Sequence, residues 1–226
     1  MKLYKTKRNY YYHSISPTYP QTRMRRFYCY LILFLCLHIF QENTLLANAC
    51  DVHIIDETCK ECAETSPHLS YDFCVSSLQV VVPPDHTLNL QEVDILALEL
   101  AIANATSTVA NIENMLSNKA YDLYSILCLK DCLQLYSDVI PVLNGSIKAI
   151  QNRNYYIANI WISAAMDAAL TCEDGFKEKE GEVSPLAKED NDLYQLCDIA
   201  LVISNLLTSR SSQLRSFVSK VSSMST

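Results

Sequence analysis

The chain has 226 residues, with 18 Lys and Arg against 25 Asp and Glu, and a formal net charge of −7 at pH 7. This acidic balance excludes a protein that coats nucleic acid or an anionic membrane surface, and it favours a basic partner. Hydrophobic residues make up 50% of the chain and glycine occurs only three times, which suits a helical domain with a substantial core.

Residues 1–49 are predicted to be a cleaved secretory signal. Within them the apolar run 27–40 would form a helix of about 21 Å, which is short of the roughly 30 Å hydrocarbon core of a bilayer. Ala47 and Ala49 then supply the small-x-small pattern that a signal peptidase requires. An uncleaved membrane anchor is the alternative interpretation, and Met24 offers a second start that would give a signal of ordinary length.

Removal of the signal would change both the charge and the redox setting of the chain. The first 49 residues hold seven of the 18 Lys and Arg and one of the 25 Asp and Glu, so 11 basic and 24 acidic residues remain, with a formal net charge of −13. Thiols of a secreted protein oxidise, and no membrane association is expected after cleavage. Two sequons, at Asn104 and Asn144, are candidate glycosylation sites, and Asn144 is favoured because Gly145 suggests a bend.

The stretch TCKECAETSPHLSYDFC holds three cysteines and a histidine. Cys59-x-x-Cys62 with His68 or His53 could bind zinc, whereas Cys59 and Cys74 could close a disulfide. The predicted oxidising compartment favours the disulfide. The surrounding residues 52–82 are expected to form two short helices around SPHLS.

Four segments with helical periodicity follow. The first begins near Asn89, which can cap a helix while Glu92 returns the hydrogen bond, and it extends to about residue 117. The second covers residues 121–151, and Pro141 predicts a kink or a break within it.

Each of the four segments carries one apolar stripe at spacings of three and four residues. Four such helices with short connections predict an all-α, up-down-up-down four-helix bundle. The serine-rich residues 211–226 either continue the last helix or fray. The predicted stripes are Val93, Leu96, Leu100, Ala103, Ser107 and Ala110; Tyr124, Cys128, Cys132, Tyr136, Val139 and Leu143; Ile157, Trp161, Ala164, Ala168, Cys172 and Phe176; and Leu193, Leu196, Ala200, Ile203 and Leu207.

Catalytic patterns are absent from the sequence. It has no repeat, no glycine-rich phosphate loop and no strand-like alternation, and His53, His68 and His86 have no orienting acid pattern. Paired carboxylates such as Glu173-Asp174 are typical of solvated helix surfaces. We expect no enzyme activity, no cofactor and no metal.

The cysteines and helices together resemble the plant invertase and pectin methylesterase inhibitor family. The resemblance rests on TCKECAETSPHLSYDFCVSSLQ, LKDCLQLYSDVIPVLNGSIKAI, ANIWISAAMDAALTCEDGF and a Leu-rich last helix, and it covers residues 52–208. The sequence is most similar to the branch typified by a pollen-allergen invertase inhibitor. The family's fold implies a helical hairpin over residues 50–84 and a four-helix bundle over residues 85–210, followed by the tail.

The resemblance also implies the disulfide pairs, Cys59 with Cys74 in the hairpin and Cys132 with Cys172 between bundle helices. The stripes suggest the second pair independently, because they point both residues into one core.

Cys50, Cys62, Cys128 and Cys197 remain unassigned. Cys128 and Cys197 either form a third bridge or stay as buried free thiols, because cysteine packs well as a small apolar residue. Cys50 and Cys62 are candidates to pair with each other.

The function that the resemblance implies is that of a secreted, monomeric, noncatalytic inhibitor of the apoplast or cell wall, or of the vacuole, which covers the substrate cleft of one enzyme. Pectin methylesterase is the expected target, because invertase inhibitors of the family often carry Pro-Lys-Phe where this chain has Ser184-Pro185-Leu186. Acid invertase is the alternative target, and a helical interaction protein with no enzyme target is the third interpretation. Partner contacts are expected on the bundle helices, at Lys130, Asp131, Tyr136, Asp138 and Lys148.

Overall fold

The computed structural model describes residues 54–79, 88–118 and 121–224. These residues form a helical segment over 54–65 and the helices α2 (Tyr71–Gln79), α3 (Leu90–Ser117), α4 (Leu123–Gln151), α5 (Tyr155–Lys177) and α6 (Ala187–Met224). The described part of the chain contains no strand, and the predicted all-α class is confirmed. The predicted signal, with Met24, and Cys50 lie outside the described residues.

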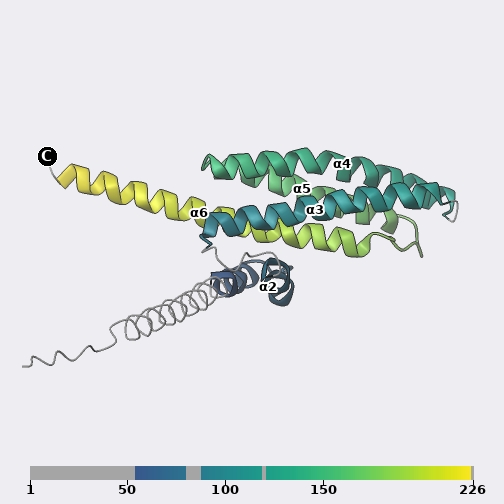
Figure 1. Ribbon diagram of the computed structural model, residues 1–226, viewed down its shortest axis with the longest axis horizontal. Helices are drawn as coiled ribbons and strands as arrows, with labels where there is room; N and C mark the ends of the chain where they lie inside the picture. The colour runs from purple at the N-terminus through teal and green to yellow at the C-terminus, as the bar shows by residue number, and fades with distance from the viewer. Residues whose placement is uncertain (1–53, 80–87, 119–120, 225–226) are drawn as a thin grey trace, which may run out of the picture. The chain divides into compact units, whose positions relative to one another are not determined.

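Helices α3 to α6 form the predicted four-helix bundle (Figure 1). Helix α3 packs against α4 and α6, and α5 packs against the same two helices on the other side. The connections 118–122, 152–154 and 178–186 are short, so consecutive helices run in opposite directions. The up-down-up-down topology is confirmed.

The start of α3 follows from the predicted capping box. The side-chain oxygen of Asn89 accepts hydrogen bonds from the backbone N–H groups of Gln91 at 3.0 Å and Glu92 at 3.2 Å. The Glu92 carboxylate in turn accepts from the Asn89 N–H at 2.8 Å. These bonds satisfy three donors that the first turn of a helix otherwise leaves unpaired.

Helix α4 passes through Pro141 and Gly145 without interruption. Of the kink or break expected at Pro141, the break is wrong. Pro141 and Ser137 are both exposed, so the Ser137 carbonyl that loses its donor can bond to water. The bend expected at Gly145 is wrong as well. Glycine serves packing there, since a Cβ at this position would lie 2.9 Å from Cζ3 of Trp161 on α5.

The apolar stripes predicted for α4 and α6 face the core, but those predicted for α3 and α5 are partly wrong. In α3, Ala103 and Ala110 are exposed, whereas Ala101 and Ala105 are buried. Helix α3 is apolar enough, by length and composition, to cross a membrane, so more than one of its faces fits the spacing. In α5, Trp161 and Ala164 are exposed, whereas Ile162 and Ala165 are buried. The buried residues are Leu90, Val93, Asp94, Ala97, Leu98, Ala101, Ala105, Thr108 and Ile112 in α3 and Tyr155, Ala158, Ile162, Ala165, Met166, Ala169, Cys172 and Phe176 in α5.

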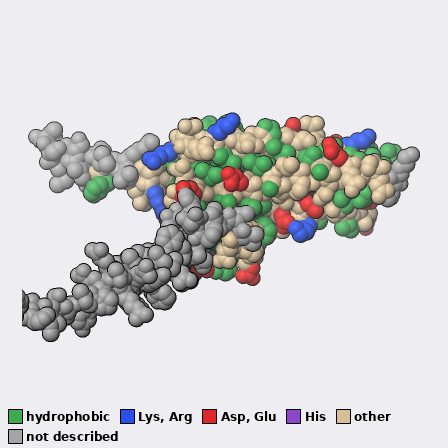
Figure 2. Space-filling view, viewed as in Figure 1, with side chains coloured by type: hydrophobic (Ala, Val, Ile, Leu, Met, Phe, Trp, Pro, Cys, Tyr) green, Lys and Arg blue, Asp and Glu red, His purple; other side chains and the backbone are tan. Residues whose placement is uncertain are grey.

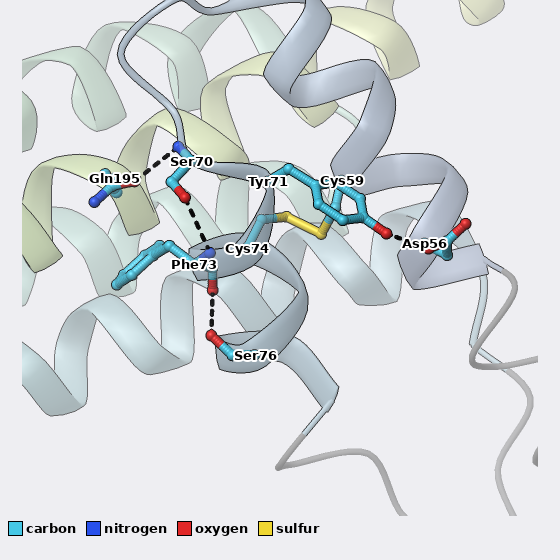
Figure 3. The surroundings of a disulfide bond; sticks show 8 residues. All are labelled: Asp56, Cys59, Ser70, Tyr71, Phe73, Cys74, Ser76 and Gln195. Atoms are coloured by element: carbon cyan, nitrogen blue, oxygen red, sulfur yellow. Dashed lines mark hydrogen bonds between the residues drawn. A yellow bond between two sulfur atoms is a disulfide. The ribbon is translucent and has the colours of Figure 1, made fainter.

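A disulfide between Cys59 and Cys74 closes the hairpin formed by segment 54–65 and α2 (Figure 3). The Tyr71 hydroxyl adds a second link between the two helices, because it donates to the Asp56 carboxylate. Two of the three cysteines in residues 58–74 therefore link the hairpin helices covalently, and Cys62 is not part of this link.

Polar contacts attach the hairpin to α6. The backbone N–H of Ser70 donates to Oε1 of Gln195 at 2.9 Å, as Figure 3 shows. The Ser66 hydroxyl donates to Asp198, which is buried on the same helix. Both contacts come from the turn between the two hairpin helices, so this turn docks on the bundle.

The last helix follows the first of the two alternatives given for the serine-rich tail. Helix α6 is continuous to Met224, and its C-terminal part runs on past the ends of the other bundle helices (Figure 1). The serine-rich residues therefore continue the helix and do not fray.

Candidate partner-binding site

Helices α4 and α5 are joined covalently beside a groove. Cys132 of α4 and Cys172 of α5 form a disulfide with their Cα atoms 5.0 Å apart. Together with Cys59–Cys74, this is the pairing that the family resemblance implies. The link holds the two helices at a fixed spacing where they line a common surface.

The groove along α4 and α5 has a volume of about 480 Å³. Leu127, which is 52% exposed, is an apolar side chain available at its edge. Asp131, Asp174 and Glu178 line it, and its lining contains no Lys or Arg, although Lys177 lies 3.5 Å from Asp174 and the Lys179 ammonium 4.8 Å from the centre of the Tyr124 ring. An exposed leucine beside three carboxylates suits a basic protein surface. The lining residues are Tyr124, Leu127, Cys128, Asp131, Cys132, Leu135, Thr171, Cys172, Asp174, Gly175 and Glu178.

Charge elsewhere on the bundle is mixed. In the face drawn in Figure 2, red acidic and blue basic side chains are scattered among green apolar groups. The charged residues that line the groove are all acidic.

Four of the five predicted contact residues are available to a partner. Lys130, Asp131, Asp138 and Lys148 are all exposed on α4, and Asp131 also lines the groove. Their part in binding stays a prediction.

Tyr136 is not available, and its prediction as a contact residue is wrong. Its side chain is 0% exposed, and its hydroxyl donates to Oδ1 of Asp190 on α6 at 2.8 Å. Burial, followed by the nearby Asp190, raises the pKa of the Tyr136 hydroxyl, so it stays protonated. Tyr136 lies on the predicted core stripe of α4, and this position already indicated a buried side chain.

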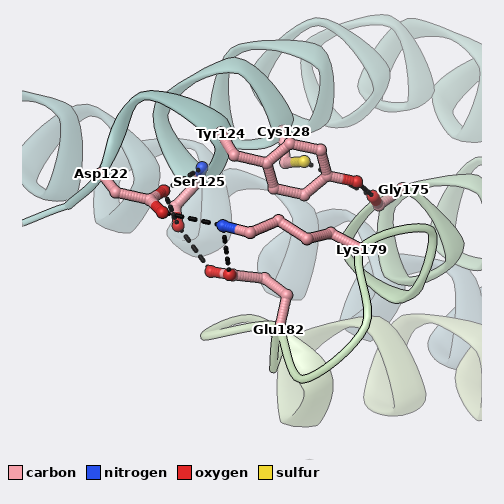
Figure 4. A network of polar contacts seen from close by, with 7 residues as sticks. All are labelled: Asp122, Tyr124, Ser125, Cys128, Gly175, Lys179 and Glu182. Atoms are coloured by element: carbon pink, nitrogen blue, oxygen red, sulfur yellow. Dashed lines mark hydrogen bonds and ion pairs between the residues drawn. The ribbon is translucent and has the colours of Figure 1, made fainter.

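The connection between α5 and α6 is tied to the start of α4 (Figure 4). The Lys179 ammonium lies 2.8 Å from Oδ2 of Asp122 and 3.0 Å from Oε2 of Glu182. The Ser125 hydroxyl lies between the same two carboxylates, and the Lys179 ammonium lies 4.8 Å from the centre of the Tyr124 ring. Sequence reasoning missed this network, because its members on α4 are more than 50 residues from those on the α5–α6 connection.

Electrostatics in this network favour the charged forms. The hydrogen bond from Lys179 holds the pKa of the Asp122 carboxyl well below its usual range. The same bond, with that to Glu182, raises the pKa of Lys179 to about 12. Asp122 also caps α4, since it accepts from the Ser125 N–H at 2.8 Å. The connection is therefore held at several points.

The tripeptide Ser184-Pro185-Leu186 is anchored in the bundle. Leu186 is 0% exposed, Ser184 is buried, and the Leu186 N–H donates to the Ser184 hydroxyl oxygen at 3.1 Å. The neighbouring Val183, in contrast, is 79% exposed. The described connection thus presents Val183 to solvent, while the tripeptide faces inward.

The other cysteines of the described chain are free. Cys62, Cys128 and Cys197 are buried and form no disulfide among the described residues, so the third bridge between Cys128 and Cys197 is wrong and the buried-thiol alternative is confirmed. The pairing of Cys62 with Cys50 involves a residue outside the described ranges. Burial, with Asp198 nearby, raises the pKa of Cys62 to about 12 and also raises that of Cys197. Both thiols are neutral core residues. No group of three or more His, Cys, Asp or Glu among the described residues is arranged to hold a metal ion.

The two sequons occupy different surroundings. Asn144 is exposed on α4, where its side-chain nitrogen donates to the Ile140 carbonyl at 2.9 Å. Asn104 is half-buried in the middle of α3, and its side-chain oxygen has no exposed surface. Glycosylation stays a prediction at both positions, and exposure favours Asn144.

Comparison with known proteins adds independent findings. Residues 53–203 match the family model described as Plant invertase/pectin methylesterase inhibitor. A protein of Platanus acerifolia named "Putative invertase inhibitor" is 39% identical over 173 residues, which is 76% of this chain and 96% of the relative. The "Pectinesterase inhibitor" of Actinidia deliciosa is 32% identical over 155 residues, 69% of this chain and 80% of the relative.

A solved structure agrees with these relatives. The crystal structure of mutant form A of a pectin methylesterase inhibitor from Arabidopsis is 28% identical, with a TM-score of 0.52, and the match covers 60% of this chain and 88% of that chain.

The fold, the groove and the inhibitor relatives define a disulfide-stabilised helical bundle that acts by binding and not by catalysis. The chain belongs to the plant invertase/pectin methylesterase inhibitor family. The family implies an enzyme as its partner, either a pectin methylesterase or an invertase.

Proposed function

We propose that this protein is a secreted inhibitor of pectin methylesterase that binds the enzyme one to one and covers its substrate cleft with the α4–α5 face. The observation that carries the proposal is the contrast between two surfaces. The α4–α5 groove presents Leu127 and three carboxylates to solvent, whereas the Ser-Pro-Leu tripeptide of the α5–α6 connection is folded inward.

Rigidity supports this mode of action. The Cys132–Cys172 disulfide joins the two helices that line the groove, so these helices lose little conformational freedom on docking. A preorganised surface converts more of its contact area into affinity than a flexible one does. Lys130, Asp138 and Lys148 lie on the exposed part of α4 and would extend the contact beyond the groove.

The α5–α6 connection argues against the other target. Invertase inhibitors of the family often use Pro-Lys-Phe there, and a side chain that enters an active site must project from the inhibitor. In this chain Leu186 is fully buried at that place and Lys179 is engaged by Asp122 and Glu182. Neither side chain is free to project.

Acid invertase is the second candidate target. The Platanus relative, with 39% identity, has an invertase inhibitor name, and this favours the same target here. The exposed Val183 at the tip of the connection would then be the contact to test.

The expected setting is the apoplast or cell wall, with the vacuole as the alternative, and the expected free state is a monomer. The relatives that support this setting include an Arabidopsis protein named "Cell wall / vacuolar inhibitor of fructosidase 2". The predicted signal at residues 1–49 would direct the chain there.

The test is a direct comparison of the two enzymes. The protein secreted by a plant or yeast line is mixed with purified pectin methylesterase and, separately, with acid invertase at about pH 5, where most carboxylates are still charged. We expect loss of esterase activity and a one-to-one complex on size exclusion. Inhibition of invertase alone would show that the second candidate is the target. Comigration with neither enzyme would indicate an interaction protein that has neither enzyme as its target.

A charge reversal tests the binding face. Asp131→Lys should weaken esterase binding by about tenfold or more, because it places a cation in a groove that complements a basic surface. The measurement is the inhibition constant at about pH 5.

The matched control is Glu113→Lys, which makes the same change in charge at an exposed position on α3, outside the groove. It should leave the inhibition constant within about threefold of the parent, because remote charge acts mainly through screened steering. If the two variants changed the inhibition constant equally, the effect would come from total charge, and the proposed binding face would be contradicted.

A further inference from the structure

Three helices meet at a buried acidic group near the start of α6. Asp190 lies in the first turn of α6, is 4% exposed, and accepts the hydrogen bond of Tyr136 from α4 through Oδ1. Glu173 of α5 lines the same cavity of about 470 Å³, which the hairpin turn borders through His68. The group thus joins α4, α5 and α6.

The remaining oxygens of the two acids pose a problem of hydrogen bonding. Oδ2 of Asp190 and Oε2 of Glu173 have no exposed surface, and no donor of the described residues reaches either one. The two acids line one cavity, and Glu173 is among the groups that raise the pKa of Asp190. Two ionised carboxylates are acceptors only and repel each other, so a proton held between them would relieve the repulsion and give both buried oxygens a partner.

We propose that Asp190 and Glu173 share one proton in the folded protein, and that this carboxyl–carboxylate hydrogen bond makes the packing of α5 against α6 sensitive to pH. In acid, the protonated Asp190 donates from Oδ2 to Oε2 of Glu173, and both buried oxygens are satisfied. When the proton leaves, two adjacent negative charges remain between the helices, and the bundle loses stability.

The groups around the pair place the proton on Asp190. Lys177 of α5 lies 3.3 Å from Oε1 of Glu173 and forms an ion pair with that side chain. Burial, together with Glu173 and Glu189, raises the pKa of Asp190 to about 7, and the bond from Tyr136 acts in the opposite direction. The other ionisable side chains that line the cavity are His68, exposed in the hairpin turn, Lys177 and Tyr194.

The sign of the effect follows from proton linkage. The folded state holds this proton up to about pH 7, whereas an unfolded Asp releases it at about pH 4. The folded protein therefore binds more protons across this interval, and its stability falls as the pH rises from about 4 to about 7. The penalty is complete above the folded pKa. This inference does not depend on which enzyme is inhibited.

Unfolding in urea at pH 5 and pH 8 tests the proposal on the full secreted protein. We expect the folding equilibrium constant to fall at least about tenfold between these two values, since one pKa unit corresponds to a factor of ten. Glu173→Gln should remove most of this fall, because the Gln amide can donate to an ionised Asp190. His68→Gln, the matched control, should retain it, because His68 is exposed and is not one of the two acids. An undiminished fall in Glu173→Gln, or its loss in His68→Gln, would overturn the proposal.

A spectroscopic measurement on the unaltered protein makes the test independent of variants. The side-chain carboxyl carbon of Asp190, assigned in ¹³C NMR by its absence in Asp190→Asn, should titrate near neutral pH. A midpoint at the ordinary value of about 4 would show that no proton is shared, whatever the urea data show.

Discussion

At the level of single residues, Gly145 determines how closely α4 and α5 approach. The Trp161 ring lies where a Cβ of residue 145 would be, with Cζ3 only 2.9 Å from that position. Gly175 on α5 has nothing within 4 Å of its equivalent position. Packing therefore requires glycine at position 145, whereas position 175 has no steric requirement for it.

Gly145→Ala should lower the free energy of unfolding by about 1 kcal/mol. Displacing a packed ring costs about 1–3 kcal/mol, and the better helix propensity of Ala returns up to about 1 kcal/mol. The emission of Trp161, which is the single Trp of the chain, should shift at the same time. The measurements are urea unfolding and fluorescence.

Gly175→Ala is the matched control for this change, and it should raise the free energy of unfolding by about 0.5–1 kcal/mol, because only propensity changes. If both substitutions raised stability equally, the Trp161 contact would not limit the size of residue 145.

At the level of elements, the two disulfides hold different parts of the fold. Cys59–Cys74 closes a separation of 15 residues within the hairpin, and Cys132–Cys172 closes one of 40 residues between α4 and α5. The Lys179 network adds noncovalent ties between the α5–α6 connection and α4. The end of the bundle near this connection is therefore cross-linked by both kinds of contact.

Replacing both members of a disulfide by Ala should have different consequences for the two bonds. In the chain-entropy model the loss is about 4 kcal/mol for Cys132–Cys172 and about 3 kcal/mol for Cys59–Cys74. Only the first bond lies beside the groove, so only its removal should also weaken inhibition under conditions in which both variants are folded. Chemical denaturation and the esterase assay measure the two effects. Equal inhibition by the two variants would show that the groove does not need its covalent link.

At the level of the whole molecule, the excess of acidic residues bears on how fast a complex forms. With the predicted signal removed, the chain has 24 acidic and 11 basic residues, and the α4–α5 groove is lined by carboxylates. An acidic surface of this kind attracts a basic partner over a distance of about one Debye length, roughly 10 Å at moderate salt.

Association with the inhibited enzyme should therefore slow as salt is added. Raising NaCl from about 0.02 M to about 0.5 M should lower the association rate about tenfold or more and change the dissociation rate less, because steering acts before contact. Stopped-flow or surface-based kinetics at constant pH resolve the two rates. An association rate that does not change with salt would show that electrostatic steering plays no part in association.

Local chemistry in the sequence determined the helices, the capping box at Asn89 and the class of protein. It did so because caps, periodicity and the family's cysteine motifs act over a few residues, and the α4 stripe with Cys132, Tyr136 and Leu143 alternated clearly with polar positions. Helix α3 had no such contrast, and only its packing against α4 and α6 decided that Ala101 and Ala105 face the core. Tertiary structure alone also placed Lys179 between Asp122 and Glu182 and brought Asp190 to Tyr136, because these contacts join residues that folding brings together across more than 50 positions of the chain.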